Sequence, residues 1–143
     1  MAPVNAPCLI ILRGLPGSGK TTWAKVYTAA HPDVVRVNQD ELRAMLHVGR
    51  AWNMVDEAVT ARVRDTLIVQ ALLLGRSVIS DDTNLTERHV THLQALVAPL
   101  GVTIECIDML TPIEECVARD ARREQPVGEQ RIREMDAQRK GLS

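Results

Sequence analysis

One glycine-rich segment, residues 14–21, constrains what this chain can fold into more than any other feature. It reads GLPGSGKT and fits the pattern G-x-x-x-x-G-K-[ST] without a mismatch. An apolar run, residues 8–12, precedes it, and a stretch with helical character, residues 21–30, follows it. Glycines let the backbone wrap closely around a phosphate, and the start of a helix adds a positive end. The segment therefore predicts a phosphate-binding P-loop between a strand and a helix.

The side chains of this segment have distinct predicted roles. Lys20 supplies a cation for the β- and γ-phosphates of a nucleoside triphosphate, and Thr21 supplies a hydroxyl ligand for Mg²⁺. The nucleotide-binding residues expected here are Gly14, Pro16, Gly17, Ser18, Gly19, Lys20, Thr21 and Thr22. Two alternatives are a turn that merely joins a strand to a helix, and a degenerate loop that binds a nucleotide and transfers nothing.

Short apolar runs alternate with helical patterns along the whole chain. The runs are residues 8–12, 34–37, 77–80 and 102–109, and the helical stretches are residues 21–30, 40–46, 53–74, 86–97, 112–123 and a last one that ends near residue 140. This alternation predicts an α/β layered sandwich in which helices flank a central four-stranded parallel sheet. The chain has 143 residues, 45% of them hydrophobic, and no linker or repeat, so we expect a single domain over residues 1–143.

Composition and charge exclude several classes of protein. The net charge of −1 argues against a protein that coats long nucleic acids through its overall field. No stretch approaches the roughly 18–20 apolar residues of a membrane span, and the N-terminus lacks the features of a signal peptide. The three cysteines form no close pair, which is typical of a reducing compartment. These observations predict a cytoplasmic protein.

Polar residues follow the second apolar run, where a parallel sheet would expose its carboxyl edge. Ligands of open α/β sheets bind at this edge. Asp40 could accept a proton from an attacking hydroxyl group, or it could cap the short helix that follows. Arg43 lies three residues further on and could hold an anionic group of the acceptor by a two-pronged hydrogen bond, or it could lie on a solvated helix face.

Two adjacent acids, Asp81 and Asp82, follow the third apolar run. One of them could orient Mg²⁺ or a water molecule that Mg²⁺ holds. Alternatively, one caps the helix that begins near Thr86 or pairs with an arginine of the expected lid, described next. The pattern alone does not choose between these roles.

Arginines gather near the C-terminal end, before a break at Pro126. Arg119, Arg122 and Arg123 have the spacing i, i+3 and i+4, which puts them on one face of a helix. This segment predicts a hinged lid whose arginines stabilise charge on the γ-phosphate. The alternative is an ordinary basic face whose arginines pair with Glu114, Glu115 and Asp120.

These elements together resemble the 5′-hydroxyl polynucleotide kinases. The segments GLPGSGKTTWAK, VNQDELR, ISDDTNLTER and CVARDARREQPV occur in the order and spacing of that family. The kinase domain of bacteriophage end-healing enzymes is the member that the chain resembles, from Leu9 to about Met135. The P-loop is shared by many families, whereas the combination of these segments is much more specific.

The resemblance implies an enzyme that transfers the γ-phosphate of ATP or another nucleoside triphosphate, with Mg²⁺, to the 5′-OH end of DNA or RNA. It implies that Lys20, Asp40, Arg43 and Arg123 are catalytic, with Asp40 as the general base and Arg43 on the phosphate next to the terminal nucleoside. It also implies that Arg119 and Arg123 bind the nucleotide from the lid. Acceptor-side residues would be Asp40, Arg43, Asp82, Thr83, Asn84 and Val127, with Asp82 supporting the site near the lid and Val127 near a base-packing position.

The resemblance also sets expectations about partners and rivals. The chain lacks the D-x-D-x-T motif of a 3′-phosphatase, so we expect a stand-alone repair kinase that touches only the last few nucleotides and works with a ligase or phosphatase. The region between Arg43 and the third apolar run is shorter than in the phage enzymes. A phage-encoded chain of this kind would act in the host cytoplasm. One rival function is a P-loop kinase for a sugar, nucleoside or antibiotic. Another is a nucleotide-binding switch module with no catalytic activity.

Overall fold

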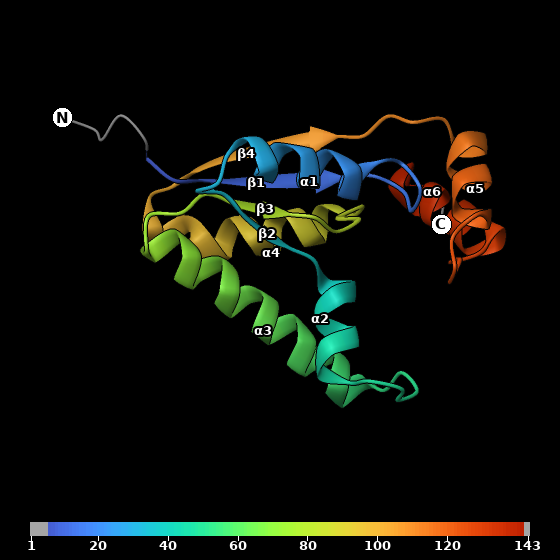
Figure 1. Ribbon diagram of the computed structural model, residues 1–143, viewed down its shortest axis with the longest axis horizontal. Coiled ribbons are helices and arrows are strands. Elements are labelled where there is room, and N and C mark those ends of the chain that lie inside the picture. The colour runs from blue at the N-terminus through green and yellow to red at the C-terminus, as the bar shows by residue number, and fades with distance from the viewer. Residues whose placement is uncertain (1–5, 142–143) are drawn as a thin grey trace.

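The computed structural model describes residues 6–141, which form a parallel sheet with helices on both faces (Figure 1). The strands are β1 (Cys8–Arg13), β2 (Val35–Val37), β3 (Val78–Ser80) and β4 (Thr103–Asp108), and their order across the sheet is β2-β3-β1-β4. All three neighbouring pairs are parallel, with Leu9 opposite Val78 in β3 and Ile104 in β4. The predicted four-stranded α/β sandwich is confirmed.

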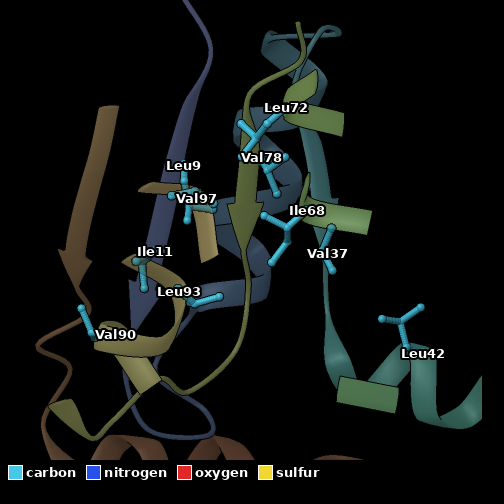
Figure 2. Packing of buried hydrophobic residues seen from close by; sticks show 10 residues of the cluster. All are labelled: Leu9, Ile11, Val37, Leu42, Ile68, Leu72, Val78, Val90, Leu93 and Val97. Carbon is cyan, nitrogen blue, oxygen red and sulfur yellow. The ribbon is translucent and has the colours of Figure 1, made fainter. Parts of the chain in front are cut away.

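Strand β1 organises the core because both of its faces are buried. Its side chains alternate between the faces. Leu9 and Ile11 pack in the larger cluster with side chains of α3 (Met54–Leu73) and α4 (Glu87–Val97), which Figure 2 shows, whereas Ile10 and Leu12 pack toward α1 (Lys20–Ala30). Each of these four side chains is at most 2% exposed. A strand buried on both faces has no polar alternation, which explains the continuous apolar run in the sequence.

Side-chain caps begin three of the helices. Asn38 accepts the N–H of Glu41 at the start of α2 (Gln39–Leu46), and Asn53 and Thr86 cap α3 and α4. The alternative in which Asp40 caps α2 is therefore wrong, because Asn38 already takes that position. Asp40 lies instead in the first turn, where its side chain is 78% exposed.

A 3₁₀ turn (Ala98–Leu100) leads into β4, and the chain then leaves the sheet to form α5 (Ile113–Ala121) and α6 (Glu129–Arg139). These two helices lie beyond the carboxyl ends of β1 and β4 (Figure 1). They pack on the P-loop through a small cluster of Leu15, Leu85, Cys116 and Ile132. Helix α5 carries Arg119, one of the arginines of the expected lid segment.

The expected helix over residues 112–123 ends earlier, at Ala121. Asp120, which is 1% exposed, explains the early end. Its carboxylate accepts the backbone N–H groups of Val127 and Gly128 at 3.0 and 2.9 Å, which closes the chain into a turn and leads it into α6. Arg122 and Arg123 therefore lie in this turn and not on the helical face that the spacing predicted. Within residues 6–141, no helix combines the length and apolar character that a membrane crossing requires.

Candidate active site

The P-loop, residues 14–21, joins the end of β1 to the start of α1 and is pressed against α5. Gly17 has a φ of +80°, and a Cβ atom there would lie 2.5 Å from the carbonyl oxygen of Cys116. A Cβ atom on Gly14 would lie 2.6 Å from Ser18 Oγ. Both positions therefore require glycine, one for its backbone angle and both for space. Pro16 is buried in the same loop.

Positive charge gathers at this loop. Lys20 is 8% exposed, and its Nζ atom donates to the carbonyl oxygens of Gly14 and Leu15, both at 2.8 Å. Burial lowers the pKa of Lys20 to about 8, and nearby carboxylates act in the opposite direction. Gly19 is the N-cap of helix α1 and forms no side-chain cap, and the first turn of the helix has no acidic residue. The positive end of the helix is therefore open to an anion. These features fit the phosphates of a nucleotide.

Thr21 and Asp81, 60 positions apart in the chain, meet beside the loop. Thr21 Oγ1 donates to Asp81 Oδ2 at 3.0 Å, and Thr22 is exposed in the same turn of α1. Asp81 is 1% exposed, and its Oδ1 atom has no hydrogen-bond partner among the residues that the structure describes. A hydroxyl next to a carboxylate with an unused oxygen fits Mg²⁺ and the water it holds. Of the two adjacent acids, Asp81 is the one that reaches the predicted metal ligand.

Asp82 lies against the start of α2. Its Oδ1 atom accepts the backbone N–H of Gln39 at 2.9 Å, and burial raises the pKa of Asp82 to about 6. The charges of Arg64 and Asp40 act on Asp82, and the acid that closes the turn after α5 is Asp120.

Thr83 and Asn84 form hydrogen bonds near the C-terminal end of β1. The carbonyl oxygen of Thr83 accepts the N–H of Gly14 at 3.0 Å. Asn84, which is 5% exposed and has a φ of +46°, donates from Nδ2 to the carbonyl oxygen of Leu12 at 2.8 Å. The first contact joins the P-loop, and the second joins β1, to the segment that follows β3.

After β2, where the acceptor is expected, Asp40 and Arg43 form a triad with Glu57, a residue that no sequence motif predicted. Arg43 Nη1 donates to Asp40 Oδ1 at 2.5 Å, and its Nε and Nη2 atoms donate to Glu57 at 2.8 and 2.7 Å. These hydrogen bonds hold the pKa of Glu57 below its ordinary value. Gln39 adds a further hydrogen bond to Glu57 at 2.8 Å. Glu57 lies in the first turn of α3 and belongs to no motif, so only the packing of α2 on α3 reveals it.

The lid arginines differ in what they contact. Arg119 Nη1 donates to the carbonyl oxygen of Gly17 at 3.3 Å, and Arg119 also pairs with Glu115. Arg123 pairs with Asp120 from the turn after α5, where Val127 also lies. The structure thus brings Arg119 to the P-loop, and it holds Arg123 and Val127 at the lid turn.

Comparison with known families is consistent with this geometry. The AAA_33 family model, described as an AAA domain, matches residues 9–142. The chain belongs to this family. Its fold is that of a P-loop kinase-like domain, with nucleotide binding implied by the family.

Several solved structures share this fold. A chain in the structure of the Pnkp1/Rnl/Hen1 RNA repair complex is 26% identical, with a TM-score of 0.85, and the match covers 99% of this chain and 46% of that one. A second structure of the complex is 28% identical with a TM-score of 0.75, over 86% of this chain and 42% of that one. The chain therefore spans less than half the length of these relatives. The APS kinase CysC of Mycobacterium tuberculosis, solved with AMPPNP and APS, has the same fold at 21% identity, with a TM-score of 0.68 and coverage of 82% and 70%.

Proposed function

We propose that this domain transfers the γ-phosphate of ATP or another nucleoside triphosphate to the 5′-OH end of DNA or RNA. The observation that carries the proposal is the position of Asp40. It follows β2 at the carboxyl edge of the sheet, where the P-loop follows β1, and its side chain is 78% exposed. An accessible carboxylate therefore lies at the same edge of the sheet as the phosphate-binding loop.

The donor side would hold the nucleotide in place. A bound nucleoside triphosphate supplies the phosphoryl group that is transferred. The backbone N–H groups of the P-loop and Lys20 bind its phosphates, and Thr21 with Asp81 holds Mg²⁺. Arg119 and Arg123 add positive charge from the lid, where it stabilises the charge that develops during transfer.

On the acceptor side, Asp40 accepts the proton of the 5′ hydroxyl group. Arg43 binds the phosphate that follows the terminal nucleoside. In the structure, the Nη1 atom of Arg43 is on Asp40, whereas Glu57 holds the other two nitrogen donors of Arg43. An acceptor phosphate that competes for Nη1 would free Asp40 for the hydroxyl while Glu57 keeps the guanidinium in position.

The test is transfer of γ-labelled phosphate from ATP to a short single-stranded oligonucleotide with a 5′-OH, with a 5′-phosphorylated strand as the control. The variants are Asp40→Asn and, as a matched control, Asp33→Asn, another exposed aspartate that pairs with one arginine, Arg76. We expect label on the 5′-OH strand only, a loss of at least about 100-fold in Asp40→Asn with ATP binding retained, and no loss in Asp33→Asn. A chain that binds ATP and labels neither strand would contradict the proposal.

A kinase for a small hydroxylated acceptor is the second candidate. It is favoured by the fact that Arg43 already has carboxylate partners, so a neutral acceptor would leave its contacts unchanged. Its signature in the same assay is transfer to a sugar or nucleoside that exceeds transfer to the oligonucleotide. Substitution of Arg43 by Gln would then change the KM for the acceptor little.

A further inference from the structure

Arg36, on β2, forms a bridge between two acids on different elements. Its Nε atom donates to Asp81 Oδ2 at 2.7 Å, and its Nη1 and Nη2 atoms donate to the two carboxylate oxygens of Glu41, each at 3.0 Å. The side chain of Arg36 is 13% exposed and that of Asp81 is 1% exposed. Low exposure makes the contact between Arg36 and Asp81 a defined interaction, whereas Glu41 is 62% exposed and is held by two parallel hydrogen bonds. We call these three residues the Arg36 bridge.

One end of the Arg36 bridge reaches the expected metal position. The Asp81 oxygen that accepts from Arg36 also accepts from Thr21 Oγ1, so one carboxylate oxygen serves both residues. An arginine side chain keeps its charge at every pH at which proteins fold. Arg36 therefore permanently reduces the negative charge that Asp81 can offer to a cation.

The other end of the Arg36 bridge reaches the acceptor side. Glu41 lies in the first turn of α2, directly after Asp40, and the hydrogen bonds from Arg36 lower the pKa of Glu41. If Asp81 binds a metal ion, Arg36 still has its two hydrogen bonds to the carboxylate of Glu41. Arg36 consequently does not have to leave its place for the metal to bind.

We propose that Arg36 is an internal counter-ion of Asp81 that competes with Mg²⁺ and so sets the Mg²⁺ concentration at which the domain binds a nucleotide. The proposal rests on the nucleotide-binding half of the proposed function and is independent of the acceptor. For the loss of Arg36, a merely structural role predicts the opposite sign, because loss of a structural support would loosen the site and weaken Mg²⁺ binding.

The experiment is a Mg²⁺ titration of the binding of a fluorescent ATP analogue, with no acceptor present. We expect Arg36→Met to lower the midpoint on the order of tenfold, since it removes a positive charge within a few ångströms of the site. Arg36→Lys keeps the charge and should keep a midpoint close to that of the wild type. A midpoint that is unchanged or raised in Arg36→Met would overturn the proposal.

Glu41→Gln is the second variant, and it keeps the proposal testable if Arg36→Met does not fold. It removes the competing acid, so Arg36 acts on Asp81 alone and the midpoint should rise about two- to threefold. A midpoint at or below that of the wild type would overturn the proposal. The experiment measures nucleotide binding. It therefore tests the role of Arg36 even if the domain transfers no phosphate to a polynucleotide.

Discussion

The buried charge of Asp82 lowers the stability of the folded state, and a single substitution should remove this destabilisation. Its Oδ1 atom accepts the N–H of Gln39, but its Oδ2 atom is buried and has no hydrogen-bond partner among the described residues. Burial raises the pKa of Asp82 from 3.8 to about 6. Because the folded state binds the proton more tightly than the unfolded state does, the stability present at low pH is lost as the pH rises through about 6.

The pKa difference gives the size of the effect. Since 1.36 kcal/mol corresponds to one pKa unit, a rise from 3.8 to about 6 corresponds to about 3 kcal/mol at pH 8. Asp82→Asn keeps an oxygen for the N–H of Gln39 and removes the buried charge. We therefore expect the variant to be more stable than the wild type by up to about 3 kcal/mol at pH 8, and by less than about 1 kcal/mol at pH 4.

Urea unfolding of both proteins at pH 8 and pH 4 measures this difference. Asp120→Asn is the control, because the carboxylate of Asp120 uses both oxygens to accept the N–H groups of Val127 and Gly128. It should lose about 1–3 kcal/mol, since an amide nitrogen replaces one acceptor. The reasoning is refuted if Asp82→Asn is no more stable than the wild type at pH 8, or if its gain is equal at the two pH values.

Two further variants test the loop and the acceptor triad. Gly17→Ala brings a Cβ atom to within 2.5 Å of the Cys116 carbonyl oxygen at a φ of +80°, so it should lose about 2–4 kcal/mol in thermal unfolding. Gly75→Ala, whose φ is +84° with nothing within 4 Å, should lose only about 1 kcal/mol, and equal losses would contradict the close contact. Glu57→Gln removes the charge that holds Arg43 and should lower kcat/KM for the acceptor about tenfold while changing stability by less than about 1 kcal/mol, because both side chains are partly exposed. An unchanged kcat/KM, measured at fixed ATP, would exclude Glu57 as a positioning residue.

Segments whose structure depends on local pattern were predicted closely. The apolar run over residues 8–12 became β1 (Cys8–Arg13), and the helix expected over residues 21–30 became α1 (Lys20–Ala30). Burial on both faces and a glycine-rich turn are visible in contiguous residues. The helix after β4 was predicted two residues too long, because the side chain of Asp120 captures N–H groups that lie seven and eight positions further on.

For the candidate active site too, one part follows from the local sequence and another part depends on the tertiary structure. The sequence alone determined the phosphate-binding loop, since residues that surround one chain of phosphates must be contiguous and must include glycine at fixed spacing. It also indicated that acids would follow β2 and β3.

Only the tertiary structure decided which residues those acids contact. The order β2-β3-β1-β4 brings Asp81 to Thr21, and the packing of α3 on α2 brings Glu57 to Arg43. Those pairings follow from how the helices and strands bury their apolar faces against each other, and the partners are separated by 60 and 14 positions in the chain. No local pattern records such a contact, because a carboxylate at a strand end is compatible with several partners until packing leaves one within reach.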